Sequence, residues 1–115
     1  MTKLTDEVQK DFSFQSFIGA ELVDADFEGA NLRRAIFDGA NLEGANFSGA
    51  DLRRSKFLKA KLSLSNMQDA KLEGADMRGI RGRYAIWRRA DWWNARMDDS
   101  LSKALNKKWP RTKNE

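Results

Sequence analysis

The stretch that decides the fold is FEGANLRRAIFDGANLEGANFSGADL, residues 27–52. Phe or Leu stands at every fifth position of this stretch, and Ala stands two residues before each of them. Helices repeat about every 3.6 residues and strands about every 2, so this spacing fits neither element. Because each short unit is too small to bury its own apolar side chains, neighbouring units must stack on one another.

The same register extends in both directions from this stretch. Central positions are apolar from Phe12 to Leu72. They then continue as Met77, Gly82, Trp87, Trp92 and Met97. Seven of the eight glycines fall two places after a central residue, where a turn tolerates unusual backbone angles. The pattern predicts a solenoid whose coils contact only their neighbours.

Units such as ANLRR (residues 30–34), ANLEG (40–44) and ADLRR (50–54) resemble the pentapeptide-repeat family. That family repeats a small residue, Asn or Asp, Leu or Phe, and two variable residues, and the resemblance covers roughly residues 12–100. It implies an all-β fold: a right-handed quadrilateral β-helix of about four to five coils, with the small and central residues pointing inward. The family's usual distribution implies a bacterial or phage origin.

With 20 residues in a coil, central residues 20 apart would share a column, and Gly82 would leave a gap in its column. Trp87 is the next central residue in the same coil, so we predict that its indole and Ile80 fill the missing volume and keep the core dense. Asn or Asp precedes the central residue and could bond the backbone of a corner at positions 26, 31, 41, 46, 51, 66, 76 and 91. Such bonding should fail where the pattern departs, at Ile36, Lys56, Lys61, Lys71, Arg81, Ile86 and Arg96.

The two ends of such a rod expose backbone and core, so each end needs a cover. We predict an N-terminal capping segment over residues 1–11, because Leu4, Val8 and Phe12 lie four apart. Residues 12–97 then form the β-helix, and residues 98–115 a short C-terminal α-helix with a basic tail.

Asp98 or Asp99 can serve as the N-cap of the C-terminal helix, and Pro110 stops it. The apolar residues of this segment have two interpretations, a cap over the last coil or a homodimer contact. The residues concerned are Leu101, Leu105 and Trp109. We favour the cap, and a contact that serves both purposes stays open.

The 115 residues contain neither cysteine nor histidine. The chain therefore lacks a thiolate nucleophile, the commonest general base and the commonest metal ligand. No P-loop, nucleophile elbow or dinucleotide fingerprint occurs either. We predict that the protein is not an enzyme and has no cofactor and no metal site.

Neither a signal peptide nor a membrane span is evident in the sequence. The N-terminal residues are rich in charge, and no stretch approaches the roughly 18 apolar residues of a transmembrane helix. We expect a cytoplasmic protein without a membrane partner, with incorporation into a virion or another assembly as an alternative.

The net charge of +4 hides an asymmetry along the chain. Residues 1–50 carry 4 basic and 9 acidic side chains, whereas residues 51–115 carry 17 basic and 8 acidic ones. Because sequence position maps onto axial position in a solenoid, one end should be acidic and the other basic. Ends of opposite charge would favour head-to-tail association between molecules, although caps at both ends would oppose it.

Two arginine clusters are candidate partner-binding sites. The first is Arg33, Arg34, Arg53 and Arg54, at the same corner of two successive coils. Like charges about 5 Å apart repel each other unless an anion or an acidic partner lies between them. The alternative is a solvated basic face that binds nothing.

The second candidate site lies in the last full coil. It comprises Arg78, Arg81, Arg83, Tyr84, Arg88, Arg89 and Trp93. Arginine interleaved with exposed aromatic side chains is typical of nucleic-acid surfaces and of protein hot spots. Alternatively, the aromatic side chains pack under the terminal helix and the arginines surround it.

The sequence thus favours a non-enzymatic protein–protein interaction or structural module with an unidentified protein partner. The family resemblance implies one alternative, DNA-mimic binding to a bacterial topoisomerase such as gyrase. Those family members are acidic along the rod, whereas this chain is basic. A second alternative is binding of nucleic acid or another polyanion by the basic C-terminal end, which would depend steeply on salt.

Overall fold

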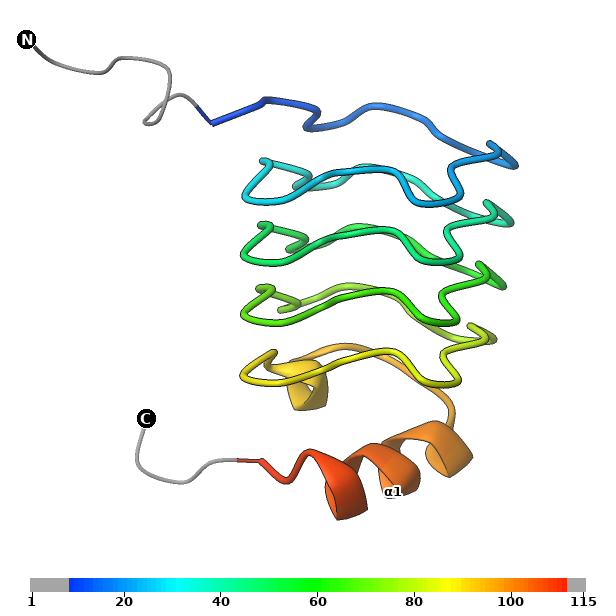
Figure 1. Cartoon of the computed structure of the whole chain (residues 1–115), viewed down its shortest axis with the longest axis vertical. Helices are drawn as coiled ribbons and strands as arrows, with labels where there is room; N and C mark the ends of the chain where they lie inside the picture. Colours follow the sequence, from blue (N-terminus) through cyan, green and yellow to red (C-terminus); the bar gives the residue numbers. More distant parts are fainter. Residues whose placement is uncertain (1–8, 112–115) are drawn as a thin grey trace, which may run out of the picture.

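A computed structural model describes residues 9–111 of the chain. The described chain winds into a stack of coils and ends in a helix that lies beneath the last coil (Figure 1). Its two helices are the 3-10 helix η2, Trp92–Asn94, and the α-helix α1, Asp99–Lys108. Within residues 9–111 the coils are joined by isolated parallel bridges. None of these bridges extends into a strand of several residues.

Each bridge joins residues that are 20 apart, so one coil contains 20 residues. Four bridges follow one another around a coil, and this gives the coil four sides. A representative set is Asn31–Asp51, Ile36–Lys56, Asn41–Lys61 and Asn46–Asn66. The predicted register of four pentapeptides per coil is therefore confirmed. The strands are so short because the chain turns again after every unit.

Each corner is a tight turn that spans the boundary between two units. At one corner the Ala35 N–H donates to the Leu32 carbonyl over 3.0 Å, and Arg34 between them has a φ of 59°. A positive φ at the third residue is the requirement of a type II turn, and glycine meets it without strain. Non-glycine residues also adopt it at nine corners, which the sequence analysis had not predicted.

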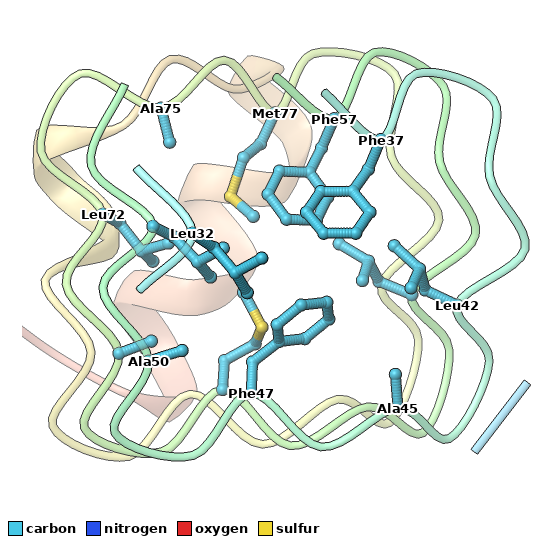
Figure 2. Close-up of a cluster of buried hydrophobic side chains, with 14 of the residues drawn as sticks. Leu32, Phe37, Leu42, Ala45, Phe47, Ala50, Phe57, Leu72, Ala75 and Met77 are labelled. Carbon is cyan, nitrogen blue, oxygen red and sulfur yellow. The ribbon is translucent and has the colours of Figure 1, made fainter. Parts of the chain in front are cut away.

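The core is built from the large side chains at the central positions and from the small side chains two residues before them. Leu32, Phe37 and Leu42 are fully buried, as is Ala35. Figure 2 shows Leu32, Phe37 and Leu42 pointing into the coil. Phenylalanine rings stack along the axis, and the ring centroids of Phe37 and Phe57 lie 4.8 Å apart. The inward orientation that the repeat predicts is confirmed.

Trp87 occupies the space that Gly82 leaves, as predicted. Its side chain is 1% exposed. A Cβ atom placed on Gly82 would lie 3.6 Å from the Trp87 indole and 3.8 Å from Ile80 Cδ1. One large residue on the neighbouring side therefore replaces the missing leucine.

The Asn and Asp side chains at the corners bond the backbone two residues further on. Asn46 Oδ1, for example, accepts from the Ser48 N–H over 2.9 Å. Seven of the eight predicted positions make this bond. Asp91 is the exception, because its Oδ1 accepts from the Leu72 N–H of the preceding coil over 2.7 Å.

The last coil departs from the repeat where η2 forms. The Asp91 carboxylate takes the place of a backbone carbonyl opposite Leu72, and the Gly74 N–H donates to the Asn94 carbonyl over 3.0 Å. The predicted column position of Trp92 is kept, because Trp92 is buried. The 3-10 turn was not predicted, since Asp91 and Trp92 fit the repeat in sequence.

Helix α1 covers the C-terminal end of the core. Leu105 is buried, and Leu101 and Trp109 pack against the core cluster. The Trp92 indole N–H donates to the Trp109 carbonyl over 2.8 Å, which ties the end of the helix to the coil. These contacts are those of a cap; a homodimer contact stays a prediction.

Asp98 stands at the N-cap position of α1, but its side chain does not cap the helix. Its Oδ2 accepts instead from the Gly79 N–H over 3.1 Å, so it pins the helix start to the coil above. The predicted N-cap position of Asp98 is confirmed, but its side chain makes no capping bond, because its carboxylate is engaged by the Gly79 amide. Leu4 and Val8 of the predicted N-terminal capping segment lie outside the described residues, as do residues 112–115 at the C-terminus.

Candidate functional site

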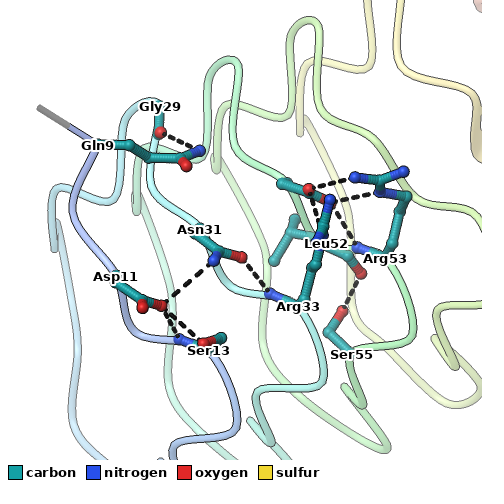
Figure 3. Close-up of polar contacts among 10 residues, drawn as sticks. Gln9, Asp11, Ser13, Gly29, Asn31, Arg33, Leu52, Arg53 and Ser55 are labelled. Atoms are coloured by element: carbon teal, nitrogen blue, oxygen red, sulfur yellow. Dashed lines mark hydrogen bonds and ion pairs between the residues drawn. The ribbon is translucent and has the colours of Figure 1, made fainter. Parts of the chain in front are cut away.

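We call Arg33, Arg34, Arg53 and Arg54 the arginine corner, because the register places all four at one corner of two adjacent coils. Asp51 lies between two of them. Its Oδ2 is 2.8 Å from Arg33 Nε and 2.7 Å from Arg53 Nη2, and its Oδ1 is 2.8 Å from Arg53 Nε. Figure 3 shows both guanidinium groups reaching this carboxylate. The anion predicted between Arg33 and Arg53 is thus supplied by the chain itself.

Asp51 stays ionised because of these contacts. The hydrogen bonds from the Arg53 side chain are the largest influence, and they hold the Asp51 pKa well below its usual range. Burial acts in the opposite direction, and the Arg53 amide and Arg33 add to the lowering. A carboxylate that is charged and 8% exposed fixes both arginines in one geometry.

Arg34 and Arg54 are oriented differently from the other two. Both take the left-handed corner conformation, with φ values of 59° and 60°. The Arg34 guanidinium lies 5.8 Å from the centroid of the Phe14 ring. No ion pair engages Arg34 or Arg54 among residues 9–111.

The four arginines line a shallow depression of about 360 Å³ together with Glu73. The repeat register brings Glu73 there, since it lies 20 residues after Arg53 in the same surface column. The sequence analysis did not name Glu73, although this spacing would have identified it. The depression therefore combines two arginines held by Asp51, two arginines without an ion pair among residues 9–111, and one carboxylate, that of Glu73.

The second predicted cluster is divided by internal ion pairs. Arg78 donates to both oxygens of Asp76 over 2.8 and 2.6 Å, and Arg89 donates to both oxygens of Asp69 over 2.6 and 3.0 Å. The arginine side-chain hydrogen bond is the largest influence on each carboxylate, and it lowers the pKa of Asp76 and of Asp69. The sequence could have predicted both pairs from spacing, because Asp76 lies two residues before Arg78 and Asp69 lies 20 residues, or one coil, before Arg89.

The aromatic residues of this cluster also separate. Trp93 is half buried and meets Trp92 edge to face, with ring centroids 5.7 Å apart. Tyr84 is exposed, and the Arg83 guanidinium lies 5.9 Å from its ring centroid. Arg81, Arg83 and Arg88 take part in no ion pair within the described part of the chain.

A larger hollow lies between the last coil and the end of α1, with a volume of about 660 Å³. Its apolar lining comes mainly from three tryptophans, Trp87, Trp93 and Trp109. Arg88 and Lys108 stand among its polar residues, beside the Arg89–Asp69 ion pair. The sequence analysis named most of these residues but did not predict the hollow, because the hollow depends on where α1 ends.

The described residues offer little for other chemistry. No group of three or more potential metal-ligating side chains gathers between residues 9 and 111. No helix in the same range is both long and apolar enough to cross a bilayer.

Comparison with known proteins gives one family match. The family model for pentapeptide repeats matches residues 11–49 and 45–81, with eight copies. None of the curated proteins is a significant match to the chain.

Several solved structures are similar to this chain. A pentapeptide repeat protein from the Arabidopsis thaliana thylakoid lumen is 34% identical, with 85% of this chain and 75% of that chain covered and a TM-score of 0.49. Rfr23, a pentapeptide repeat protein from the cyanobacterium Cyanothece 51142, is 24% identical, with 85% and 68% covered and a TM-score of 0.42. QnrB1, a plasmid-mediated fluoroquinolone resistance protein, is 14% identical, with 92% and 73% covered and a TM-score of 0.45.

Proposed function

This chain belongs to the pentapeptide-repeat family, and from that premise we propose that it is a non-enzymatic protein-interaction module. Its arginine corner binds an acidic segment of a protein partner. The observation that carries this proposal is that Asp51 pairs with only two of the four arginines. Arg33 and Arg53 are held by that carboxylate, while Arg34 and Arg54 have no ion-pair partner between residues 9 and 111.

Pre-organisation supports binding at this corner. Ordering a long side chain on association costs roughly 0.5–1.5 kcal/mol, and the Asp51 contacts have already ordered Arg33 and Arg53. Arginine forks bind carboxylates through two parallel hydrogen bonds. Arg34 and Arg54 stand on adjacent coils, about 5 Å apart along the rod, so two carboxylates of one segment can engage them together.

Glu73 favours a protein partner over a uniform polyanion at this corner. Its carboxylate lines the same depression as the four arginines. A nucleic-acid backbone would bring only negative charge against it, which is unfavourable at short range. An acidic protein segment with one neighbouring hydrogen-bond donor or basic side chain satisfies both signs of charge.

The test is affinity capture from a bacterial lysate with the full chain as bait, with and without nuclease, followed by mass spectrometry. One variant combines Arg34→Gln with Arg54→Gln. The matched control combines Lys59→Gln with Lys61→Gln, which removes the same charge from exposed positions on other sides of the rod. Lys59 also shares the left-handed corner conformation, with a φ of 59°.

We expect one discrete protein to be retained by the wild type and by the lysine control, and to be lost with the arginine variant. Nuclease should not change its retention. Binding should then be remeasured with that purified protein, where the arginine variant should weaken affinity by roughly tenfold or more. Equal capture by both variants would refute the role of the corner. A gyrase subunit as the retained protein would favour the topoisomerase alternative.

A second candidate function is polyanion binding by the C-terminal end. It is favoured by Arg83 beside the exposed Tyr84 ring, because exposed aromatic and arginine faces stack on nucleobases. Binding to a labelled single strand should weaken by about 0.7 log units per log unit of salt for each phosphate contact. An Arg83→Gln, Tyr84→Ala variant with undiminished affinity would exclude this surface.

Family membership also bears on the sense of winding. We propose that the coils wind in the right-handed sense that the family resemblance implies. The strong preference for right-handed crossovers between parallel strands supports this assignment.

A further inference from the structure

The N-terminal end of the rod is open in the described part of the chain. Phe12, Phe17 and Leu22 begin three core columns and are only half buried, whereas the residues below them in the stack are fully buried. The backbone at this end is open too. Asn31 and Ile36 donate their N–H groups to carbonyls of the coil above, but Asp11 and Ser16 have no coil above them within residues 9–111. Among residues 9–111, this end therefore presents apolar side chains and hydrogen-bonding groups that no other described residue covers.

Exposed apolar side chains gather on the same coil. Phe14, Ile18 and Val23 are 71%, 63% and 49% exposed. The other large apolar side chains that stand exposed in the described range are three, Leu64, Tyr84 and Ile86, spread over two further coils. Clustered exposed apolar residues mark interaction surfaces, whereas scattered ones need no explanation.

The two ends of the molecule carry opposite charge. We call residues 9–29, the first coil, the head, and residues 78–111, the last coil with α1, the tail. The head contains one lysine and five acidic residues, a net charge of −4. The tail contains ten basic and three acidic residues, a net charge of +7. Each end therefore repels its own kind and attracts the other.

We infer that the chain associates with itself head to tail: the acidic, apolar first coil of one molecule docks on the basic cap of the next. The tail supplies a receptor for apolar side chains in the hollow, where the half-buried Trp93 and Trp109 are accessible. Lys108 and Arg88 line the same hollow, where the acidic side chains of the head would meet them. Helix α1 does not obstruct this contact, because its basic last turn forms part of the docking surface.

Charge selects this arrangement over the symmetric ones. Head-to-head pairing would bring two surfaces of −4 together, and tail-to-tail pairing two surfaces of +7. Head-to-tail contact is heterologous, so every assembly still has one free head at one end and one free tail at the other, and it grows with concentration.

The experiment uses sedimentation velocity of the full chain over a range of protein concentrations. Two variants each disable one end. Phe14→Asn removes the most exposed apolar side chain of the head, and the pair Arg88→Glu, Lys108→Glu reverses two exposed charges that line the hollow of the tail. Asparagine is chosen because it tolerates the left-handed conformation that Phe14 adopts.

Each variant has a matched control in the middle of the rod. Leu64→Asn makes the same kind of change at a side chain that is 61% exposed with a φ of 63°. Lys56→Glu with Lys61→Glu makes the same charge reversal on exposed lysines of the middle coils. Far-UV circular dichroism is to be recorded for all four variants, as the check that each keeps the fold.

We expect the wild type and both controls to associate, and the head and tail variants to sediment as monomers at the same concentrations. A mixture of the head and tail variants should form a heterodimer that grows no further, since it contains one intact head and one intact tail. Raising sodium chloride from about 0.1 M to about 1 M should weaken wild-type association, because the Debye length falls from about 10 Å to about 3 Å.

Three results would overturn the inference. The first is a wild type that stays monomeric at about 1 mM, the weak end of measurable affinity. The second is a tail variant that still dimerises while the head variant does not, which would identify head-to-head pairing. The third is the reverse pattern, which would identify a dimer through the C-terminal end.

Discussion

At the scale of single residues, Asp51 shows how one side chain can serve fold and surface together. Its Oδ1 accepts from the Arg53 N–H over 3.2 Å, which is the corner bond that Asn31 and Asn46 also make with their own turns. Its charge adds what an asparagine cannot supply, the ionic contacts to Arg33 and Arg53. The turn would survive the loss of the charge, but the geometry of the arginine corner would not.

We predict that Asp51→Asn lowers the free energy of unfolding by about 1–2 kcal/mol at neutral pH, because asparagine keeps the turn but loses the charged hydrogen bonds. Since the folded-state pKa of Asp51 is lowered, its contribution is present above the ordinary aspartate pKa of about 3.9 and is lost as pH falls below it. Urea titrations at pH values from about 7 to about 2 should show the gap between variant and wild type closing.

Asn31→Ser is a control for this prediction, because it alters a neighbouring corner in the same surface column without touching an ion pair to Asp51. A stability gap for Asp51→Asn that stays constant across this pH range would contradict the proposed role of the charge.

At the scale of one coil, the last coil of the rod departs from the repeat, and contacts between individual side chains compensate for the departure. Gly82 breaks the central row, and Trp87 and Ile80 close the space. Asp91 and η2 then replace a regular bridge, and the Trp92 indole reaches the carbonyl of Trp109. The coil next to the cap is thus built from individual contacts between large side chains, whereas the coils above it are built from the repeat.

We predict that Trp87→Leu lowers the free energy of unfolding by about 3 kcal/mol, since it leaves a cavity beside Gly82. Adding Gly82→Leu should restore part of this loss, because the second change returns the regular leucine to its column. Gly82 is suited to the change, since its φ lies outside the left-handed region. Denaturant titration of the two single variants and the double variant gives the coupling energy between the sites.

Gly82→Leu in the wild-type background completes this cycle and should be destabilising, because the new side chain would compete with the indole for one space. Additive effects of the two substitutions would show that Trp87 does not fill the volume missing at Gly82.

At the scale of the whole molecule, the axis organises both stability and charge. Each coil bonds only the coil before and the coil after it. A middle coil therefore has two bonded neighbours, whereas the head has one among the described residues. The tail has the core contacts of Leu105 and the Trp92–Trp109 hydrogen bond instead. Negative charge accumulates at the head and positive charge at the tail.

We predict that amide hydrogen exchange is graded along the axis. Amides of residues 31–71, which bond carbonyls on adjacent coils, should exchange slowest, and those of the first coil fastest. Mass-spectrometric exchange at a protein concentration low enough to keep the chain monomeric measures this directly. Uniform protection from the first coil to the last would contradict nearest-neighbour stability along the rod.

The sequence by itself determined the register of this protein. A period of five residues with small and large apolar rows can bury both rows only if units stack, so the coil, its inward columns and the pairing of Gly82 with Trp87 could all be predicted. Seven of the eight corner bonds followed from the same local pattern, because a short polar side chain needs only its own turn to make that bond.

Only the tertiary structure decided which charges remain available for binding. Sequence spacing leaves open which polar groups on adjacent coils come within bonding distance. The structure pairs Arg33 with Asp51, Arg89 with Asp69, and the Asp98 carboxylate with the Gly79 amide. A long charged side chain can reach several partners, and the ordered arrangement is the one with the best combined hydrogen bonds. The periodic core is encoded locally, whereas the arrangement of surface charges is set by competition among neighbours on adjacent coils.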